Sequence, residues 1–117
     1  MKLILLKRLE KLGFVYKQSE VVELHNRKFR VLKGTIRKIP DKDDAWLYEL
    51  AKHSRVVFDV GSNIGQSAML MLYHNNIEKI VLIDPNPKAL SYAAENLIMN
   101  DLSGKAHFIT AFASEKD

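Results

Sequence analysis

The sequence contains no cysteine, and no part of it is a long hydrophobic run. Without cysteine the chain can form neither a disulfide framework nor a thiolate metal site. A membrane-spanning helix needs about 20 consecutive apolar residues, which no segment approaches. The apolar patch near the start covers only residues 3–6, too few for the core of a signal peptide. These absences predict a globular domain in the cytoplasm with no membrane span.

Charge is distributed unevenly along the 117 residues, whose formal net charge is +4. Residues 1–40 carry eleven lysines and arginines against three glutamates, a balance of +8. Residues 41–117 carry seven basic against eleven acidic residues, a balance of −4. A basic segment is typical of proteins that bind nucleic acid or another anionic surface, but the solvated face of a helix and a hairpin has the same composition. Both interpretations stay open, and the solvated face is the simpler one.

Residues 1–43 are predicted to form an N-terminal segment of their own. Its first part is an amphipathic helix that ends at Gly13, a residue suited to a helix C-cap. The stretch VVELHNRKFRVLKG alternates apolar and polar residues on both sides of His25 and Asn26, which is typical of a β-hairpin. TIRKIP is expected to add a short strand that ends at Pro40. The helix is indicated by leucines at helical spacing: Leu3, Leu5, Leu6, Leu9 and Leu12.

A second unit is predicted over residues 44–117, and it begins with a helix over residues 45–53. Asp43 or Asp44 can cap the start of this helix. Its buried face is expected to consist of its large apolar residues, Trp46, Leu47 and Leu50.

Residues 55–110 have the pattern of an α/β unit. RVVFDV and KIVLID are short continuous apolar runs, typical of strands buried on both faces, and KAHFIT is a third strand. Two segments with helical patterns separate these strands: residues 64–74 after the first strand, and the stretch NPKALSYAAENLIMN after the second. The order β-α-β-α-β predicts a parallel sheet with right-handed crossovers. The fold class is therefore α/β, the N-terminal half of a Rossmann-like doubly wound sheet, preceded by a helix, a β-hairpin and a second helix.

The turn over residues 61–65, here called the glycine turn, is the main candidate for a ligand site. In such folds ligands lie outside the carboxyl ends of the strands. Gly61 permits a tight turn, Gly65 lets the next helix pack closely, and free amides at the helix start are expected to face the ligand. Asn63 stands where a dinucleotide-binding turn has its second glycine, and no Gly-Lys-Ser/Thr follows. The turn therefore favours a ligand without phosphates.

An acidic residue ends the second strand of the unit. Asp84 lies nineteen residues after Gly65, where a carboxylate can accept hydrogen bonds from both hydroxyls of a ribose. An adenosine without phosphates, held by a glycine turn and an acid, indicates S-adenosylmethionine. The alternative is a βαβ unit with a tight turn and an incidental Asp84.

Three spaced stretches carry a family pattern: FDVGSNIGQSA, VLIDPNPKAL and AAENLIMN. The first is similar to a strand followed by D-x-G-A-N-x-G, the second to a strand followed by an acid-P-N-P run, and the third to an asparagine-bearing helix. Together they resemble the FkbM-like class I S-adenosylmethionine-dependent methyltransferases. The resemblance covers about residues 45–117. It implies that the cofactor is S-adenosylmethionine.

The resemblance also implies roles for the matching residues. Asp59 would orient the glycine turn and meet the amino group of the cofactor, and Asp84 would bind the ribose. Asp84 stands in place of the commoner glutamate and has a shorter reach. The methionine portion would be lined by residues of the turn: Gly61, Ser62, Asn63 and Gly65. The adenine side would be shaped by residues after the next two strands: Pro85, Asn86, Thr110 and Ala111.

The family's domain continues past the third strand, whereas this sequence stops at AFASEKD. The resemblance therefore implies a truncated cofactor-binding half that is itself inactive. A strand that is central in the family would lack one neighbour, and the unpaired edges of buried strands are sticky. We expect the chain to self-associate through an exposed sheet edge.

Three functions remain open at this stage. The resemblance implies methyl transfer to a hydroxyl oxygen of a sugar, a lipid-linked glycan or a small metabolite. The basic residues 1–40 favour an RNA methyltransferase, and an incomplete domain also fits a non-catalytic module with a vestigial cofactor loop. No catalytic residue is predicted, because a base for the acceptor would belong to the missing half. No metal site is predicted, because the histidines lack ligand spacing: His25, His53, His74 and His107.

Overall fold

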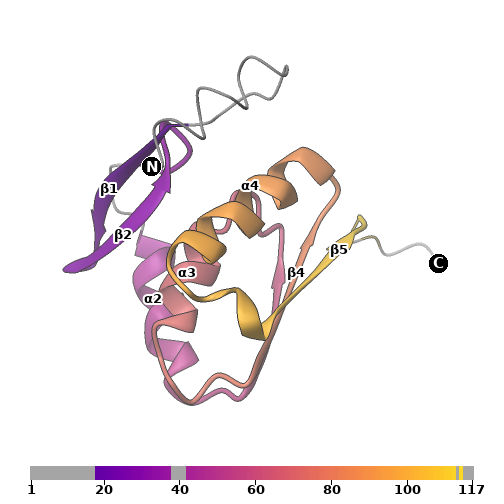
Figure 1. The fold of residues 1–117 in the computed structure, drawn as a ribbon. Coiled ribbons are helices and arrows are strands. Elements are labelled where there is room, and N and C mark those ends of the chain that lie inside the picture. Colours follow the sequence, from indigo (N-terminus) through magenta and orange to yellow (C-terminus); the bar gives the residue numbers. More distant parts are fainter. Residues whose placement is uncertain (1–17, 38–41, 113, 115–117) are drawn as a thin grey trace.

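The computed structural model describes residues 18–37, 42–112 and 114. The predicted helix that ends at Gly13 lies outside these residues. In the described part, a two-stranded sheet and a three-stranded sheet are joined by helices (Figure 1). Within the same ranges, no helix has both the length and the apolar character that a membrane crossing requires.

The predicted hairpin is confirmed. Strand β1 (Ser19–Leu24) pairs antiparallel with β2 (Arg27–Leu32). His25 and Asn26 join the strands with φ angles of 47° and 63°, so both residues have a left-handed backbone conformation. Two left-handed residues give the turn a twist that matches the twist of the flanking strands, which is why a two-residue turn closes this hairpin.

The strand predicted from TIRKIP is wrong over residues 35–37, which are not part of any strand. Gly34 has a φ of 78° and turns the chain directly after β2. Both the amide and the hydroxyl of Thr35 donate to the Leu32 carbonyl, at 3.1 and 2.6 Å. These bonds close a turn where a further short strand was expected. Residues 38–40 lie outside the described part of the chain.

Helix α2 (Lys42–Ala51) is confirmed, but its predicted buried face is right only for Leu47, which packs against the core. Trp46 and Leu50 are 70% and 60% exposed. The face that packs on the neighbouring helix consists of Asp44, Leu47, Tyr48 and Ala51. Asp44 can be buried because its carboxylate accepts a hydrogen bond from a glutamine of the next helix, so a polar partner and not hydropathy selects this face.

The predicted β-α-β-α-β order is confirmed. Strands β3 (Val56–Val60), β4 (Lys79–Asp84) and β5 (Ala106–Thr110) are parallel and lie in the order β3-β4-β5. Helices α3 (Gln66–Leu72) and α4 (Pro87–Met99) connect them and lie on the same side of the sheet (Figure 1). A short 3₁₀ turn, η1 (Ser103–Lys105), precedes β5.

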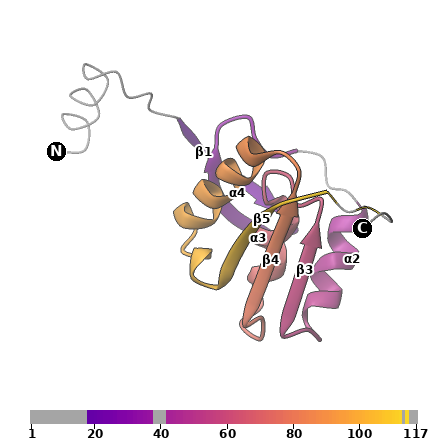
Figure 2. The same cartoon turned by 90° about the vertical axis from the view of Figure 1, so that its right-hand side faces the viewer.

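The two faces of the three-stranded sheet differ sharply. Ile80 and Leu82 of β4 are completely buried on the side that carries α3 and α4. Figure 2 looks onto the other side, where the apolar side chains of β3 are exposed: Val56, Phe58 and Val60. The prediction of strands buried on both faces is therefore wrong for β3 within the described residues, because no described element covers that side.

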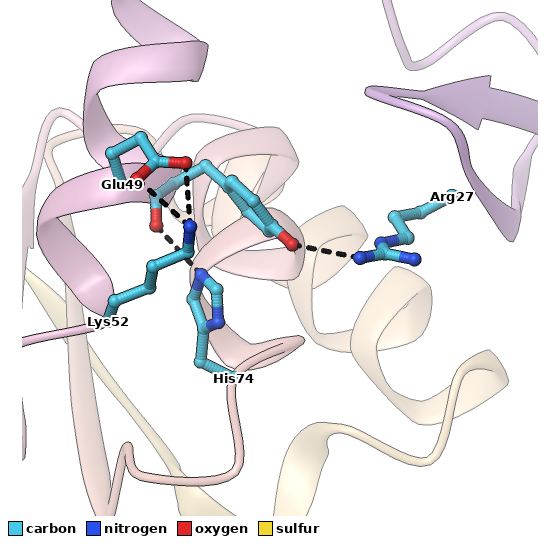
Figure 3. Close-up of polar contacts among 5 residues, drawn as sticks. Arg27, Glu49, Lys52 and His74 are labelled. Carbon is cyan, nitrogen blue, oxygen red and sulfur yellow. Dashed lines mark hydrogen bonds and ion pairs between the residues drawn. The ribbon is translucent and has the colours of Figure 1, made fainter.

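The hairpin and the α/β unit share one hydrophobic core. Phe29 and Val31 of β2 belong to the same buried cluster as Leu70 of α3 and Leu97 of α4. At the start of β2, the Arg27 guanidinium donates to the Tyr48 hydroxyl at 3.2 Å, on the α2 side of the hairpin (Figure 3). The predicted division of the chain between residues 43 and 44 stays a prediction.

Candidate functional site

The residues predicted to bind a ligand come together at one edge of the sheet. Asp59 lies near the carboxyl end of β3, and Asp84 and Thr110 are the last residues of β4 and β5. The register pairs Asp84 with Thr110, and the Ala111 amide donates to the Asp84 carbonyl at 3.2 Å. Parallel pairing brings all three strand ends, and the glycine turn after β3, to the same edge.

The glycine turn depends on three residues with left-handed backbones. Gly61, Asn63 and Gly65 have φ angles of 76°, 48° and 87°. Asparagine tolerates this conformation better than most residues, which explains how Asn63 can occupy its place without being a glycine. Gly65 has a second constraint, because a Cβ there would lie 3.0 Å from the Cβ of Ala93 in α4.

Four amides of the glycine turn are bonded inside the protein. The Gly61 and Ser62 amides both donate to the Ile83 carbonyl, at 2.7 and 3.2 Å. The Asn63 amide donates to Asp84 Oδ2 at 2.9 Å, and the Gly65 amide donates to the Ser62 carbonyl at 3.0 Å. The prediction of free amides at the helix start is wrong for Gly65, whose amide is bonded. A pyrophosphate would find none of these four amides available, in keeping with a ligand without phosphates.

Asp84 braces this edge of the sheet. Its Oδ2 accepts from the Asn63 amide and its Oδ1 from the Asn86 amide, each at 2.9 Å, and its side chain is buried. Each carboxylate oxygen keeps a second lone pair that a ribose hydroxyl can use.

Pro85 and Asn86 lead from Asp84 into α4, and both are exposed. The Asn86 side chain caps the helix, because its Oδ1 accepts from the amides of Lys88 and Ala89 at 3.0 and 3.3 Å. This pair of residues therefore shapes the chain between β4 and α4, and the Asn86 oxygen is committed to the cap.

Asp59 is an unusual carboxylate because it is buried beside other acids. Burial raises its pKa above the ordinary value, a hydrogen bond from the Ser67 hydroxyl at 2.8 Å opposes this shift, and the charges of Asp44 and Asp84 add to it. A carboxylate held in such surroundings is a candidate for binding a cationic group of a ligand.

A cavity of about 370 Å³ lies on the α2 side of the glycine turn. It reaches neither Asp84 nor Thr110. The Ser62 hydroxyl, on this wall, is buried and has no hydrogen-bond partner among the described residues. The lining consists of Thr35, Arg37, Asp44, Gly61, Ser62, Asn63, Ile64, Gln66 and Ser67.

Six lining residues of this cavity were missed from the sequence: Thr35, Arg37, Asp44, Ile64, Gln66 and Ser67. Three of them are tied together, since the Arg37 amide donates to Gln66 Oε1 at 3.1 Å and Gln66 Nε2 donates to Asp44 Oδ2 at 2.9 Å. Gln66 could have been noticed, because it directly follows Gly65. Nothing in the sequence indicated that Thr35 and Arg37 line the cavity, because only tertiary packing brings them to the glycine turn.

Within the described ranges, no group of three or more histidine or acidic side chains is placed so that it could hold a metal ion. The arrangement instead offers a braced turn, three buried carboxylates (Asp44, Asp59 and Asp84) and a buried hydroxyl, that of Ser62, with no partner among the described residues. These groups can recognise a polar ligand with a positive charge and several hydroxyls.

No protein-family model matches the sequence, and no curated protein matches it either. Solved structures do resemble the fold. An S-adenosylmethionine-dependent methyltransferase from Agrobacterium tumefaciens matches 86% of this chain with a TM-score of 0.61 and 16% identity. The complex of aTrm5 and tRNALeu matches 88% with a TM-score of 0.60 and 21% identity. M. capricolum TrmK with S-adenosylhomocysteine matches 64% with a TM-score of 0.57 and 20% identity.

The chain spans about a third of the length of these structures, 34%, 31% and 33% respectively. At such identities the likeness concerns the fold. The chain therefore has the Rossmann-like α/β fold found in S-adenosylmethionine-dependent methyltransferases.

Proposed function

We propose that this chain binds S-adenosylmethionine and forms the cofactor-binding half of a methyltransferase. The observation that carries the proposal is the meeting of the glycine turn, the buried Asp84 and the Ser62-lined cavity at one edge of a parallel sheet. Solved structures with this fold support it, because they include a protein that holds S-adenosylhomocysteine. The cofactor supplies a methyl group on a sulfonium centre.

In this proposal the two sides of the glycine turn hold different parts of the cofactor. The methionine portion lies against Gly61, Ser62, Asn63 and Gly65, where the Ser62 hydroxyl gains the partner that it lacks. Asp59 meets the amino group. Asp84 accepts from the ribose hydroxyls. The adenine lies toward the residues that follow β4 and β5: Pro85, Asn86, Thr110 and Ala111.

Titration with S-adenosylhomocysteine, followed by calorimetry, tests the proposal. We expect saturable binding that weakens more than tenfold in Asp84→Ala, because two buried acceptor oxygens are lost. Glu23→Ala removes an exposed carboxylate of β1 and serves as the matched control, with unchanged affinity. Absence of binding to the wild-type chain contradicts the proposal and leaves the non-catalytic module as the remaining function. Equal affinity in Asp84→Ala contradicts the assigned role of Asp84.

For the acceptor, we propose a hydroxyl oxygen of a sugar, a lipid-linked glycan or a small metabolite. The support is the FkbM-like sequence pattern, above all the DPNP run over residues 84–87. Methyl transfer requires mainly that cofactor and acceptor are held in line at close range. The test is acceptor screening with a chain extended to the length of the similar structures, and transfer to nitrogen or carbon acceptors alone contradicts this assignment.

RNA is the second candidate acceptor. One similar structure is a complex with tRNALeu, and the hairpin carries basic residues that are exposed: Lys28, Arg30 and Lys33. If they contact phosphates, affinity for RNA must fall steeply as salt rises. Filter binding over a salt series, with Lys28→Ala/Lys33→Ala as the test variant, decides this point. No binding at low salt removes the candidate.

We also propose that the chain self-associates through β3. Among the described strands β3 pairs with β4 alone, and Phe58 is 65% exposed. An unpaired apolar strand is a template for pairing with another copy. Sedimentation velocity is expected to show a dimer that Phe58→Lys weakens. A wild-type monomer at high micromolar concentration contradicts this part of the proposal.

A further inference from the structure

Asn96 of α4 is the most completely buried polar residue near the glycine turn, with an exposed fraction of 0%. Its Oδ1 accepts from the Leu32 amide of β2 at 2.8 Å. Its Nδ2 donates to the Ile64 carbonyl in the turn at 3.1 Å and reaches the Thr35 hydroxyl at 3.4 Å. One side chain thus joins the hairpin, the segment after it and the glycine turn.

Asn100, the C-cap of α4, lies four residues after Asn96 and provides a natural comparison. Its Oδ1 accepts from the Arg30 amide at 2.8 Å, and its Nδ2 donates to the Arg30 carbonyl at 2.7 Å. Arg30 and Leu32 alternate along β2, so the two asparagines together bond the outer edge of this strand as a neighbouring strand would. Asn100 has no hydrogen bond to the glycine turn.

Helix α4 fixes the turn at two consecutive residues. Ala93 lies against Gly65, where an added Cβ would be only 3.0 Å from the Ala93 Cβ, and Asn96 holds the carbonyl of Ile64. Ala93 and Asn96 are three positions apart and share one face of the helix. Ile64 and Thr35, the two residues that Asn96 Nδ2 bonds, both line the cavity beside Ser62.

We propose that Asn96 is a positioning residue that couples the hairpin to the glycine turn and so sets the shape of the cofactor cavity. Its Nδ2 fixes one cavity wall through Ile64 and another through Thr35, while its Oδ1 anchors both to β2. Asn96 touches the walls and not the ligand. The inference rests on the proposed function, since it assigns the cavity to S-adenosylmethionine.

The test compares Asn96→Ala with Asn100→Ala by calorimetric titration with S-adenosylhomocysteine. Both variants release an edge of β2, but only the first releases the glycine turn. We expect Asn96→Ala to weaken binding about tenfold, because a freed buried carbonyl lets the turn leave its bound geometry. Asn100→Ala is expected to lower thermal stability with an affinity change below about twofold. Equal losses of affinity in the two variants overturn the proposal.

Two further measurements keep the proposal testable, one if Asn96→Ala does not fold and one if the wild-type chain does not bind the ligand. If Asn96→Ala does not fold, the wild-type chain is titrated while the Asn96 side-chain amide and the Leu32 amide are followed by NMR. Saturable shifts at both support the coupling, and unshifted signals at saturation overturn it.

If the wild-type chain binds no S-adenosylhomocysteine, the proposed function fails. The coupling between Asn96 and the glycine turn is then measured by hydrogen exchange in the absence of ligand. Hydrogen exchange of the Asn63 and Gly65 amides must then be faster in Asn96→Ala than in Asn100→Ala. Equal exchange in the two variants overturns the coupling independently of any cofactor.

Discussion

The two sides of the glycine turn are built differently. On the β4 side, both carboxylate oxygens of Asp84 accept hydrogen bonds from backbone amides. Pro85 and Asn86, which follow it, are exposed. On the α2 side, a cavity is enclosed by three segments, and the Ser62 hydroxyl is buried there without a partner in the described residues. The difference indicates that the β4 side sets the conformation of the turn, while the α2 side retains unsatisfied polarity for a ligand.

Removing Asp84 is expected to have the largest effect, because it takes the brace away from the turn. Asp84→Ala leaves the buried amides of Asn63 and Asn86 without an acceptor and should lower the free energy of unfolding by about 3 kcal/mol. Asp84→Asn keeps one acceptor oxygen and should lose about half as much. Urea denaturation measures both, and a loss below about 1 kcal/mol in Asp84→Ala would show that the carboxylate does not brace the turn.

Gly65→Ala is expected to come next, because it strains the backbone and also collides with α4. A Cβ at Gly65 meets Ala93 at 3.0 Å in a left-handed conformation, so the loss should be about 2 to 3 kcal/mol. Gly61→Ala has the same kind of backbone but meets nothing within 4 Å, so it isolates the strain, about 1 to 2 kcal/mol.

Gly104→Ala is the matched control for this series, since its backbone is not left-handed and its added Cβ has open space. It should be neutral or slightly stabilising. Thermal unfolding of the three variants ranks them. If Gly61→Ala and Gly65→Ala lose the same amount, the contact with Ala93 does not constrain the turn.

Gln66→Ala tests the α2 side and should cost less than the loss of Asp84. It leaves the buried Asp44 carboxylate and the Arg37 amide without this partner, for a loss of about 1 to 2 kcal/mol. Asp44→Ala/Gln66→Ala removes the orphaned carboxylate as well, so it should cost less than the sum of the two single variants. Strict additivity in denaturation would mean that the Gln66–Asp44 bond contributes nothing to this wall.

Asp59→Asn should have the smallest effect, and it should be stabilising at neutral pH. Burial raises the pKa of Asp59, so at a pH between the unfolded and the folded pKa the native state still holds a proton that the unfolded state has released, and above both values the buried charge destabilises the native state. Stability from this group is therefore present below the unfolded pKa and is lost as pH rises through the folded pKa. Asparagine removes that loss and can still accept from Ser67.

The expected melting temperature of Asp59→Asn exceeds that of the wild type at pH 7, and the difference closes as the solution is acidified toward pH 4. In the proposed function the same change weakens cofactor binding. If Asp59→Asn is less stable than the wild type at neutral pH, the assigned upward shift of the Asp59 pKa is contradicted.

The local features of the fold could be predicted from the sequence. Alternation around His25 and Asn26 gave the hairpin, apolar runs gave the three parallel strands, and the helical pattern of NPKALSYAAENLIMN gave α4. Strand ends in a parallel sheet share an edge, so the meeting of Asp84 with the glycine turn followed from order alone.

Features that depend on tertiary partners could not be predicted. The exposed side of α2 carries Trp46 because Asp44 finds a partner in Gln66, and nothing in the local pattern reveals that bond. Asn96 is a polar residue within an apolar stripe, and its role requires knowing that β2 passes beside α4. The bonded amides of the turn likewise depend on where Ile83 and Asp84 lie.

Amide chemical shifts during titration with S-adenosylhomocysteine test the central claim most directly. The proposed function predicts saturable shifts on both sides of the turn, at Ser62 and Gln66 on the α2 side and at Asp84 and Ala111 on the β4 side. No saturable shift at these residues, or shifts confined to the hairpin surface around Lys28, would contradict a cofactor site at the glycine turn.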